Sequence, residues 1–451
     1  MIGDGPVLQA IHMPTLNISE FSCLDEATFQ LAPVNVIIGP QGSGKSVTTK
    51  LFYFLTDIQT SYFQYAERGD TIEDYKKQVA RLFKIWFPPS AWGQGRFNIG
   101  YTAGDFSVRL LRRKSQGKLS EDLSVTFSEW FSDIYNETRH QFERQKDFED
   151  IESTSNLSIS ELDRGWRVRE VMQRRALRDL ERQYIGQQTF IPAGRAFFTS
   201  IGRLVAGLEQ AGSLDPVTLK FARLFANLRD RNASRRPGYA SRLGHEFLTR
   251  RKHIMNQLFG GEIRFENETE FVQAEDGRRI PFTSLSSGQQ ELLPMWSLMD
   301  YFSEIDALTY RGPGRPVRRA SELVYIEEPE AHLFPSAQSL LMEFLIGSLV
   351  SERSQRSLVI TTHSPYIMGK LNVFLKAGQL SRRKKRNQDI NNVVPRDCWL
   401  DENRLSALAI ENGTMRDLTD SDGLIDGTYL DQVSEDISRQ FSTLLKIESE
   451  I

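Results

Sequence analysis

The sequence predicts an α/β protein with a mostly parallel core sheet, an antiparallel β subdomain and a helical insertion. A largely β-branched run at residues 29–38 leads directly into a glycine-rich loop, and apolar residues then recur at helical spacing at Val47, Leu51 and Leu55. Short strand-like segments separated by turn residues occupy 96–127. The last third alternates strand and helix, which is typical of parallel sheets.

The first half of the chain contains the glycine-loop strand, an antiparallel set and a charged helical region. Residues 29–38 (FQLAPVNVII) indicate one buried strand. Turn residues such as those at 102–105 separate three expected antiparallel strands, at 96–101, 106–111 and 123–127. Residues 137–182 are highly charged with a helical pattern that the polar stretch 153–156 interrupts. We therefore expect two short helices that project from the body.

The second half begins with a short strand at 189–192 and a helical pattern over 196–226. Residues 229–252 hold eight basic and two acidic residues, which indicates a basic, loop-rich insertion. A second basic run, SRRKKR, lies at 381–386, and the segment after it turns acidic. The alternating elements of the last third are a strand at 323–326, a helix at 336–350 and a strand at 357–362.

These elements suggest four regions. Residues 1–130 form the N-terminal part of the main domain with its antiparallel strands, 131–260 the helical insertion with the basic loop, 261–378 the C-terminal part of the main domain, and 379–451 a C-terminal tail that serves as an interaction segment.

Composition and charge exclude several classes of protein. The 451 residues are 39% hydrophobic and 25% charged, as in globular proteins, and suffice for two or three packed units. The net charge of −3 argues against a basic protein that coats nucleic acid, although local basic patches remain.

The longest apolar stretch, 340–350, is interrupted by Glu343 and is shorter than the roughly 20 residues that span a bilayer. The N-terminus lacks a signal-peptide pattern, so we expect a cytoplasmic protein without a membrane partner. Cys23 and Cys398 offer neither a disulfide framework nor a Cys-x-x-Cys metal clamp.

The glycine loop matches G-x-x-x-x-G-K-[ST] between a strand and a helix. Its glycines let successive N–H groups point at phosphate oxygens, and the helix N-terminus adds its dipole. Lys45 would reach the β- and γ-phosphates, and the Ser46 hydroxyl would hold Mg²⁺. The expected ligands are thus ATP and Mg²⁺, and the expected binding residues are Gly39, Pro40, Gln41, Gly42, Ser43, Gly44, Lys45, Ser46 and Val47.

Two carboxylates follow the apolar strand at 323–326, at the strand end where open α/β sheets place their ligands. Glu327 would orient Mg²⁺ through its water, and Glu328 would position or deprotonate the attacking water. Paired glutamates alone are more often solvated surface, but a buried strand and a phosphate loop favour the functional interpretation.

A Ser-Ser-Gly-Gln sequence at 286–289 precedes a helix-like segment. Alone it is more typical of an ordinary turn that caps a helix. Its position gives it weight, because it follows the phosphate loop and its Gly288 comes 40 residues before Glu328. A strand ending at His363 comes next.

In this order the four motifs resemble those of the ATP-binding cassette (ABC) ATPases, and more narrowly the soluble SMC and RecF-like branch. The resemblance covers about residues 11–55 and 260–370. It implies the ABC-ATPase nucleotide-binding fold and a head-to-tail dimer, within a larger oligomer, in which the signature of one copy closes over the γ-phosphate held by another. It further implies Glu328 as catalytic base, His363 as a switch histidine, Glu327 and Ser46 at the metal, and Ser286, Ser287, Gly288 and Gln289 at the nucleotide in trans. The Q-loop residue stays open between Gln187, Gln188 and Arg195.

The sequence at 327–333 (EEPEAHL) and that at 362–366 (THSPY) look more specifically like ATPases of bacterial anti-phage systems. These are the OLD-type, Septu PtuA (including retron-associated PtuA) and PARIS AriA group. The resemblance implies a partner effector, either an HNH nuclease of the PtuB type or a Toprim-like protein, and places residues 330–333 in a subunit-crossing loop.

Departures from the family pattern suggest slow ATP hydrolysis, because Glu327 replaces the usual Asp, Gln41 a common Asn and Ser287 a common Gly. Only 88 residues follow His363, too few for a Toprim domain, so we expect no nuclease activity in this chain. The alternative is a RecF-like DNA-repair ATPase that grips DNA through residues 229–252 and 382–386.

Overall fold

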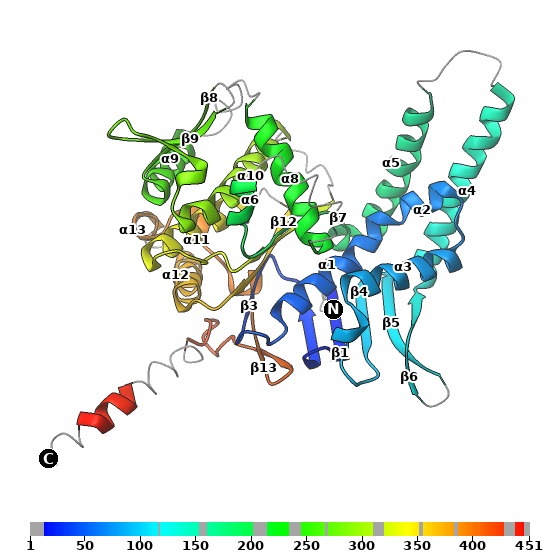
Figure 1. Ribbon diagram of the computed structural model, residues 1–451, viewed down its shortest axis with the longest axis horizontal. Coiled ribbons are helices and arrows are strands. Elements are labelled where there is room, and N and C mark those ends of the chain that lie inside the picture. Colours follow the sequence, from blue (N-terminus) through cyan, green and yellow to red (C-terminus); the bar gives the residue numbers. More distant parts are fainter. Residues whose placement is uncertain are drawn as a thin grey trace, which may run out of the picture.

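The computed structural model describes residues 13–115, 118–152, 160–201, 214–233, 245–266, 269–309, 320–350, 355–382, 387–427 and 438–445. They form a large mixed sheet with helices on both faces, a separate small sheet and a projecting helical hairpin (Figure 1). The predicted α/β class is confirmed.

The main sheet has 11 strands in the order β6-β5-β4-β1-β2-β14-β13-β3-β12-β11-β7. In chain order these strands are β1 (Thr15–Phe21), β2 (Leu24–Gln30), β3 (Val34–Ile38), β4 (Asn98–Ala103), β5 (Phe106–Ser115), β6 (Lys118–Phe127), β7 (Ile185–Ile191), β11 (Ser321–Glu327), β12 (Arg356–Thr362), β13 (Leu405–Glu411) and β14 (Thr414–Asp417). Strands β13, β3, β12, β11 and β7 run parallel, whereas β2, β1, β4, β5 and β6 are antiparallel. The carboxyl ends of β3, β11 and β12 therefore meet at one edge of the parallel half.

The helices of the described ranges are α1 (Lys45–Ser61), α2 (Phe63–Arg68), α3 (Ile72–Trp86), α4 (Glu129–Glu152), α5 (Ser160–Leu180), α6 (Ala196–Ile201), α8 (Pro216–Ala233), α9 (His245–Phe259), α10 (Ser287–Thr309), α11 (Pro335–Leu349), α12 (Pro365–Ser381) and α13 (Asn387–Val393). The small sheet contains β8 (Gly261–Glu266), β9 (Thr269–Ala274) and β10 (Arg279–Pro281). None of the helices within the described ranges is both long and apolar enough to cross a bilayer.

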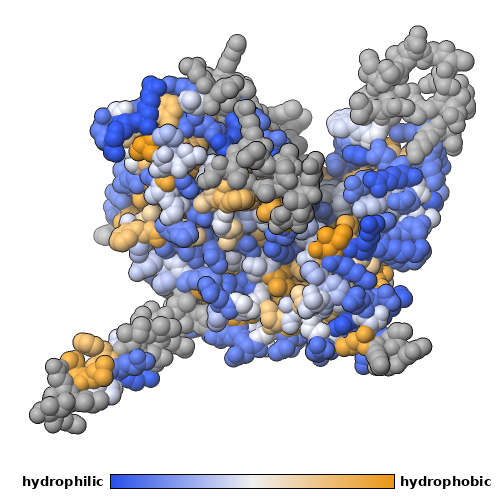
Figure 2. Space-filling view, viewed as in Figure 1, coloured by the Kyte–Doolittle hydropathy of each residue, from blue (hydrophilic) through white to orange (hydrophobic). Residues whose placement is uncertain are grey.

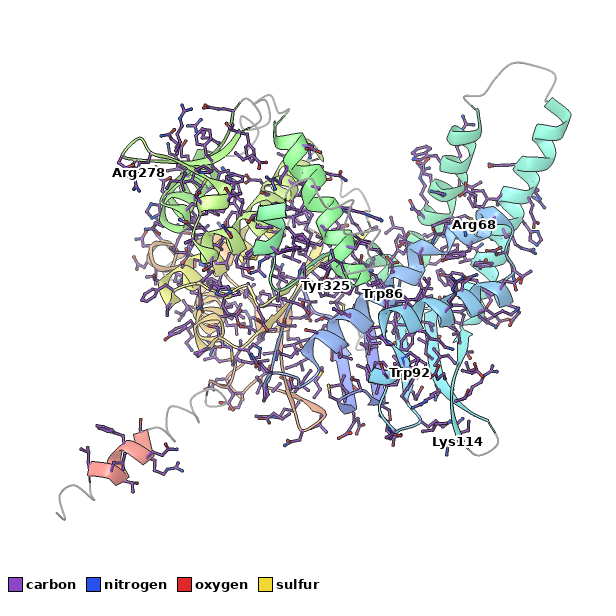
Figure 3. The ribbon with its side chains drawn as sticks, viewed as in Figure 1. Arg68, Trp86, Trp92, Lys114, Arg278 and Tyr325 are labelled. Carbon is purple, nitrogen blue, oxygen red and sulfur yellow. The ribbon has the colours of Figure 1, made fainter. Side chains whose placement is uncertain are left out.

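Strand alternation divides the apolar residues of the sheet between two cores. On β11, Leu323 and Tyr325 face the core with α1 to α5, and Val324 and Ile326 face the core with α8 to α12. The first core is rich in aromatic rings. Tyr325 packs on Tyr53 with ring centroids 5.6 Å apart, and Figure 3 labels Tyr325 in the middle of the molecule. Both faces of the parallel strands are thus buried, which explains their continuous apolar runs.

The run at 29–38 forms two strands instead of the single strand that we predicted. Proline has no N–H to donate, and Pro33 lies in the break between β2 and β3. The buried Asn35 side chain closes the turn, since it accepts from the Ala32 N–H at 2.8 Å and donates to the Ala32 carbonyl at 2.7 Å. This turn lets β2 join the antiparallel half and β3 the parallel half.

Two other segments differ in extent from the sequence-based expectation. Helices α4 and α5 are long, with 24 and 21 residues, and form the hairpin that projects from the body (Figure 1). Strands β13 and β14 belong to the segment 379–451, which we expected to be a tail. Strand β13 pairs in parallel with β3, so this segment forms hydrogen bonds with the strand that leads into the glycine loop.

Candidate nucleotide site

The glycine loop connects β3 to α1 at the carboxyl edge of the parallel strands. Gly42 and Gly44 have left-handed φ values of 76° and 109°, which glycine adopts most readily. A Cβ atom on Gly39 would lie only 2.6 Å from the Ile410 carbonyl oxygen, so that glycine is needed for close approach to β13. The Ser43 hydroxyl is buried without a hydrogen-bond partner. The loop is therefore a narrow backbone turn with polar groups available at a helix N-terminus, where anions bind.

Lys45 is buried with only 7% of its surface exposed, and its ammonium group points back at the loop. Its Nζ donates to the carbonyl oxygens of Gly39 at 2.7 Å and Pro40 at 2.8 Å. Burial lowers the pKa of Lys45, while the Glu328 carboxylate acts in the opposite direction. The neighbouring Ser46 is exposed, and the first turn of α1 carries no acidic side chain that would repel a phosphate.

Strand β11 ends with the two predicted carboxylates in different environments. Glu327 is 7% exposed, and its Oε2 accepts from the Ala193 N–H at 3.4 Å. Its Oε1 is buried without a hydrogen-bond partner. Glu328 is half-buried, and its backbone is in the left-handed region with a φ of 44°. Its N–H nevertheless donates to the carbonyl oxygen of Thr361 on β12 at 2.9 Å. The structure thus separates one enclosed carboxylate from one that turns toward the strand edge.

The residues present fit Mg²⁺, which prefers oxygen ligands. Glu327, through its unpartnered Oε1, and Ser46, through its exposed hydroxyl, are the residues that would hold the Mg²⁺ ion. When bound, Mg²⁺ would neutralise negative charge on phosphate oxygens.

The end of β12 lies against the end of β11 through two carboxylates. His363 places its Nε2 3.2 Å from Glu328 Oε1, which joins the predicted base to the predicted switch histidine. Glu330 Oε1 accepts from the His363 N–H at 2.7 Å and from the Thr362 hydroxyl at 2.6 Å. The sequence analysis missed this role of Glu330. The parallel register of β11 and β12 is the signal that could have suggested it, because such strands end side by side.

The Ser-Ser-Gly-Gln sequence begins α10 and caps it. The Ser286 hydroxyl accepts from the Gln289 N–H at 3.4 Å, and the Gln289 side chain accepts from the Ser286 N–H at 3.1 Å. This reciprocal pair is a capping box, so the ordinary capping interpretation applies. Ser286 and Ser287 nevertheless stay exposed, and a Cβ atom on Gly288 would lie 2.6 Å from the His332 carbonyl oxygen. Within the described residues, no hydrogen bond or ion pair joins 286–289 to 39–46 of the same copy.

The Q-loop candidates occupy two distinct places. Gln188 lies inside β7 and is committed to the core, since it donates to the Tyr53 carbonyl at 3.1 Å and accepts from the Tyr325 hydroxyl at 2.8 Å. Gln187 precedes it on the same strand. Arg195 lies four residues beyond the end of β7 and is fully buried.

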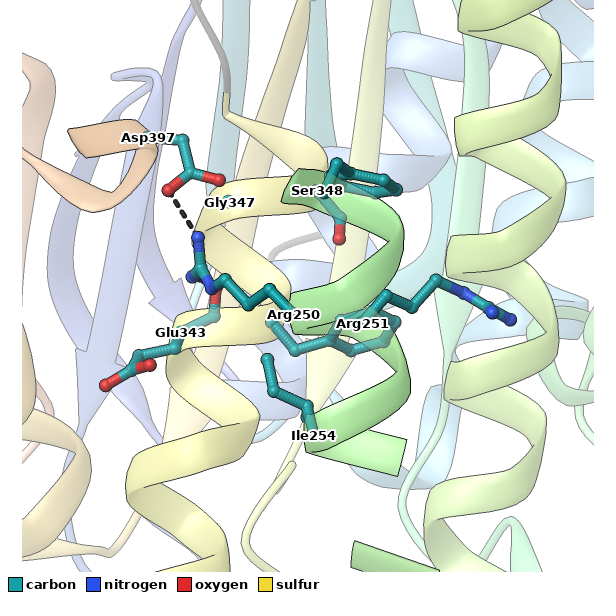
Figure 4. Close-up of a pocket in the computed structure, with 9 residues that line it drawn as sticks. Arg250, Arg251, Ile254, Glu343, Gly347, Ser348 and Asp397 are labelled. Atoms are coloured by element: carbon teal, nitrogen blue, oxygen red, sulfur yellow. Dashed lines mark hydrogen bonds and ion pairs between the residues drawn. The ribbon is translucent and has the colours of Figure 1, made fainter. Parts of the chain in front are cut away.

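The described parts of the two basic segments carry paired charges. Figure 4 shows Arg250 against Asp397, beside a pocket between α9 and α11. The other described pairs are Arg229–Glu270, Arg231–Glu304, Arg251–Asp300, Lys252–Glu262, Arg382–Asp401 and Arg382–Glu402. Residues 234–244 and 383–386 lie outside the described residues. The basic side chains of the described residues in these segments are thus paired with carboxylates, and they do not favour the DNA-binding alternative.

Residues 34–369 match the model of a family described as "AAA domain, putative AbiEii toxin, Type IV TA system". That match spans well over half of the chain and includes the glycine loop, both carboxylates and His363. The chain belongs to this AAA-domain family. Families of this kind bind ATP and generally hydrolyse it with Mg²⁺, in agreement with the ligands expected from the sequence.

Two solved structures are similar to this member of the AAA-domain family. One is an SMC head bound to the C-winged helix domain of ScpA, with 11% identity, a TM-score of 0.38 and coverage of 89% of this chain and 95% of that one. The other is the SMC head domain from Thermotoga maritima, with 11% identity, a TM-score of 0.34 and coverage of 89% and 97%. No curated protein matches the chain.

The exposed thiol of Cys23 can serve as a chemical probe of the glycine loop. Its Sγ lies 3.1 Å from the position that a Cβ atom on Gly44 would take, so the thiol lies beside the loop that is expected to hold the phosphates. Cys398 is buried, and burial raises its pKa to about 12, which keeps that thiol unreactive. We expect a maleimide to label Cys23 alone and saturating ATP to slow that labelling by roughly fivefold or more, because only the free form reacts.

Peptide mass spectrometry after timed labelling measures this effect. Cys23→Ser should take up no label, and Lys45→Ala should label at one rate with and without ATP. An unchanged rate in wild-type protein that binds ATP in a separate assay would place the nucleotide away from this turn.

Proposed function

We propose that two copies of this chain bind two ATP molecules between them in a head-to-tail dimer, within a larger oligomer, and hydrolyse them slowly. The observation that carries the proposal is the division of the predicted site. Lys45, Glu327, Glu328 and His363 meet at the carboxyl edge of one sheet. Ser286 and Ser287 at the start of α10 are exposed, and no hydrogen bond or ion pair among the described residues joins 286–289 to the glycine loop of the same copy, so a second copy is needed to complete the site.

In this proposal Glu328 accepts the proton of the attacking water, and His363 responds to the γ-phosphate. The Glu328 carboxylate is paired with His363, so it becomes free to act as a base only when that pair opens. A γ-phosphate that draws His363 away would open it. Hydrolysis would then depend on complete closure of the site, which agrees with slow turnover.

Exposed aromatic side chains beside the site support a second copy. Phe334, at the start of α11, is 77% exposed, and Tyr366, in the first turn of α12, is 53% exposed. The two helix starts are joined by a hydrogen bond from Ser364 to Gln338 at 2.5 Å. Aromatic residues are enriched in protein interfaces, so this face is suited to burial against another subunit.

We further propose that ATP-driven closure regulates a partner effector nuclease in anti-phage defence, of the HNH or Toprim-like kind. This step rests on the Septu- and PARIS-like sequence at 327–333 and on the toxin named in the family description. Residues 438–445 also expose an apolar set that a partner could cover, formed by Phe441, Leu444 and Leu445 (Figure 2).

The composite site is tested by mixing two inactive variants. Ser286→Arg should leave ATP bound to the glycine loop but block closure, whereas Lys45→Ala should lose ATP binding. A heterodimer of the two contains one doubly damaged and one intact site. Mixing at equal concentrations should therefore restore about a quarter of wild-type ATPase activity, since about half of the dimers are mixed and each has one working site.

Each variant incubated alone should stay inactive, and fluorescence transfer between labelled subunits should show that they exchange. Mixtures that exchange subunits without regaining activity would refute the composite site and favour an ATPase that acts within one copy.

A further inference from the structure

Arg195 is a fully buried arginine, so its side chain is not accessible to a ligand. Its guanidinium donates to the carbonyl oxygens of Glu327 at 2.9 Å, Glu328 at 3.2 Å and Pro329 at 3.4 Å. It also donates to the Glu291 carbonyl at 3.0 Å and lies 3.5 Å from the Glu291 carboxylate, which is an ion pair. One side chain thus holds two separate elements of the candidate site.

The first element is the turn that carries Glu328. Because Glu328 is left-handed at φ 44°, its conformation costs free energy and must be stabilised by its surroundings. The bonds from Arg195 fix the carbonyls on both sides of that residue. The side chain of Glu328 is therefore aimed at His363 by a backbone that Arg195 holds.

The second element is the start of α10. Glu291 lies in the first turns of this helix, just after the exposed Ser286 and Ser287 and the buried Gly288. A rigid displacement of the helix start would carry Glu291 with it. Since Arg195 binds Glu291 through both the backbone and the carboxylate, the displacement would reach the guanidinium directly.

Arg356, at the beginning of β12, is a buried arginine that provides a contrast. Arg356 is also buried, at 6% exposure, and its guanidinium is paired with Asp306 and Glu322. It lies at the beginning of β12, and Glu322 near the beginning of β11, at the edge opposite the candidate site. Arg356 therefore secures the scaffold without contact to the nucleotide edge.

We propose that Arg195 is a positioning residue that couples the start of α10 to Glu328. Nucleotide held by a second copy contacts the exposed Ser286 and Ser287 and shifts α10. The shift is transmitted through Arg195 to the carbonyls of 327–329, and Glu328 separates from His363. The proposal rests on the proposed ATPase function. It adds a chain of contacts through which closure of the dimer would change the position of Glu328, the proposed base.

The test compares Arg195→Lys with Arg356→Lys, since each keeps a buried positive charge but loses the planar fork that binds several oxygens. Arg195→Lys should bind ATP within about threefold of wild type yet lose about tenfold to 100-fold in kcat, because a misplaced base costs this much. Arg356→Lys should keep kcat even if its melting temperature falls. Combining Arg195→Lys with Glu328→Gln should give no further loss beyond that of Glu328→Gln, because both changes disable the same group.

Hydrogen exchange in full-length, nucleotide-free protein provides a readout that does not depend on turnover. Arg195→Lys should raise amide exchange at both 287–291 and 327–333, and Arg356→Lys at neither. Full kcat in Arg195→Lys, independent kcat losses in the double variant, or unchanged exchange at the two segments would each overturn the coupling. A wild-type protein without ATPase activity would instead refute the proposed function, while the exchange comparison would still decide whether Arg195 links the two elements.

Discussion

Lys45→Ala is expected to abolish measurable nucleotide binding, with the Kd for a fluorescent ATP analogue raised by about 100-fold or more, since charge-assisted bonds to phosphate are the strong ones in such a loop. Lys45 is the cation that the loop encloses, and its ammonium already lies at the carbonyl oxygens of Gly39 and Pro40. Phosphate oxygens would compete for the same group. Equilibrium titration monitored by fluorescence anisotropy measures the loss.

Lys50→Ala is the matched control, because Lys50 belongs to the same helix but pairs with Asp215 at 3.5 Å near the surface. This variant should bind the analogue like wild type. Lys45→Ala also removes two hydrogen bonds within the loop, so its melting temperature must be compared as well. A folded Lys45→Ala protein with wild-type affinity would refute the assignment of the loop.

Local signals predicted those parts of the site that depend on one segment. The strand, the glycine loop and α1 are consecutive, and the structure shows how the predicted bend of the loop is made, with left-handed φ values at Gly42 and Gly44. The position of Glu327 and Glu328 at a strand end was predictable for the same reason, since a buried apolar run directly precedes them. The capping of α10 by Ser286 was one of the two alternatives that the sequence left open.

Parts that depend on distant segments could not be predicted. Strand β13 is buried because it pairs with β3, hundreds of residues earlier, and its own sequence gives no sign of that neighbour. Arg195 presented the same difficulty. Most of its partners are backbone carbonyls, which every residue possesses, so no residue pattern marks them.

Glu328→Gln should leave the binding of ATP and Mg²⁺ close to wild type while kcat falls by about 100-fold or more, within the range typical for loss of a general base. The amide keeps the shape of the side chain and can still bond to His363 across the present 3.2 Å contact, but it cannot accept a proton from water. A single-turnover assay with excess protein measures the chemical step itself.

Glu327→Gln is the informative comparison, because it alters the neighbouring, enclosed carboxylate whose Oε1 has no protein partner. If Glu327 holds Mg²⁺, this variant should require more Mg²⁺ for half-maximal activity, and added Mg²⁺ should recover part of the rate. Excess Mg²⁺ should not rescue Glu328→Gln, since that defect lies in proton transfer. The opposite result, with Glu328→Gln active and Glu327→Gln inactive at every Mg²⁺ concentration, would reverse the two roles. The enclosed oxygen of Glu327 would then be the base, and the left-handed turn at Glu328 would serve to position it.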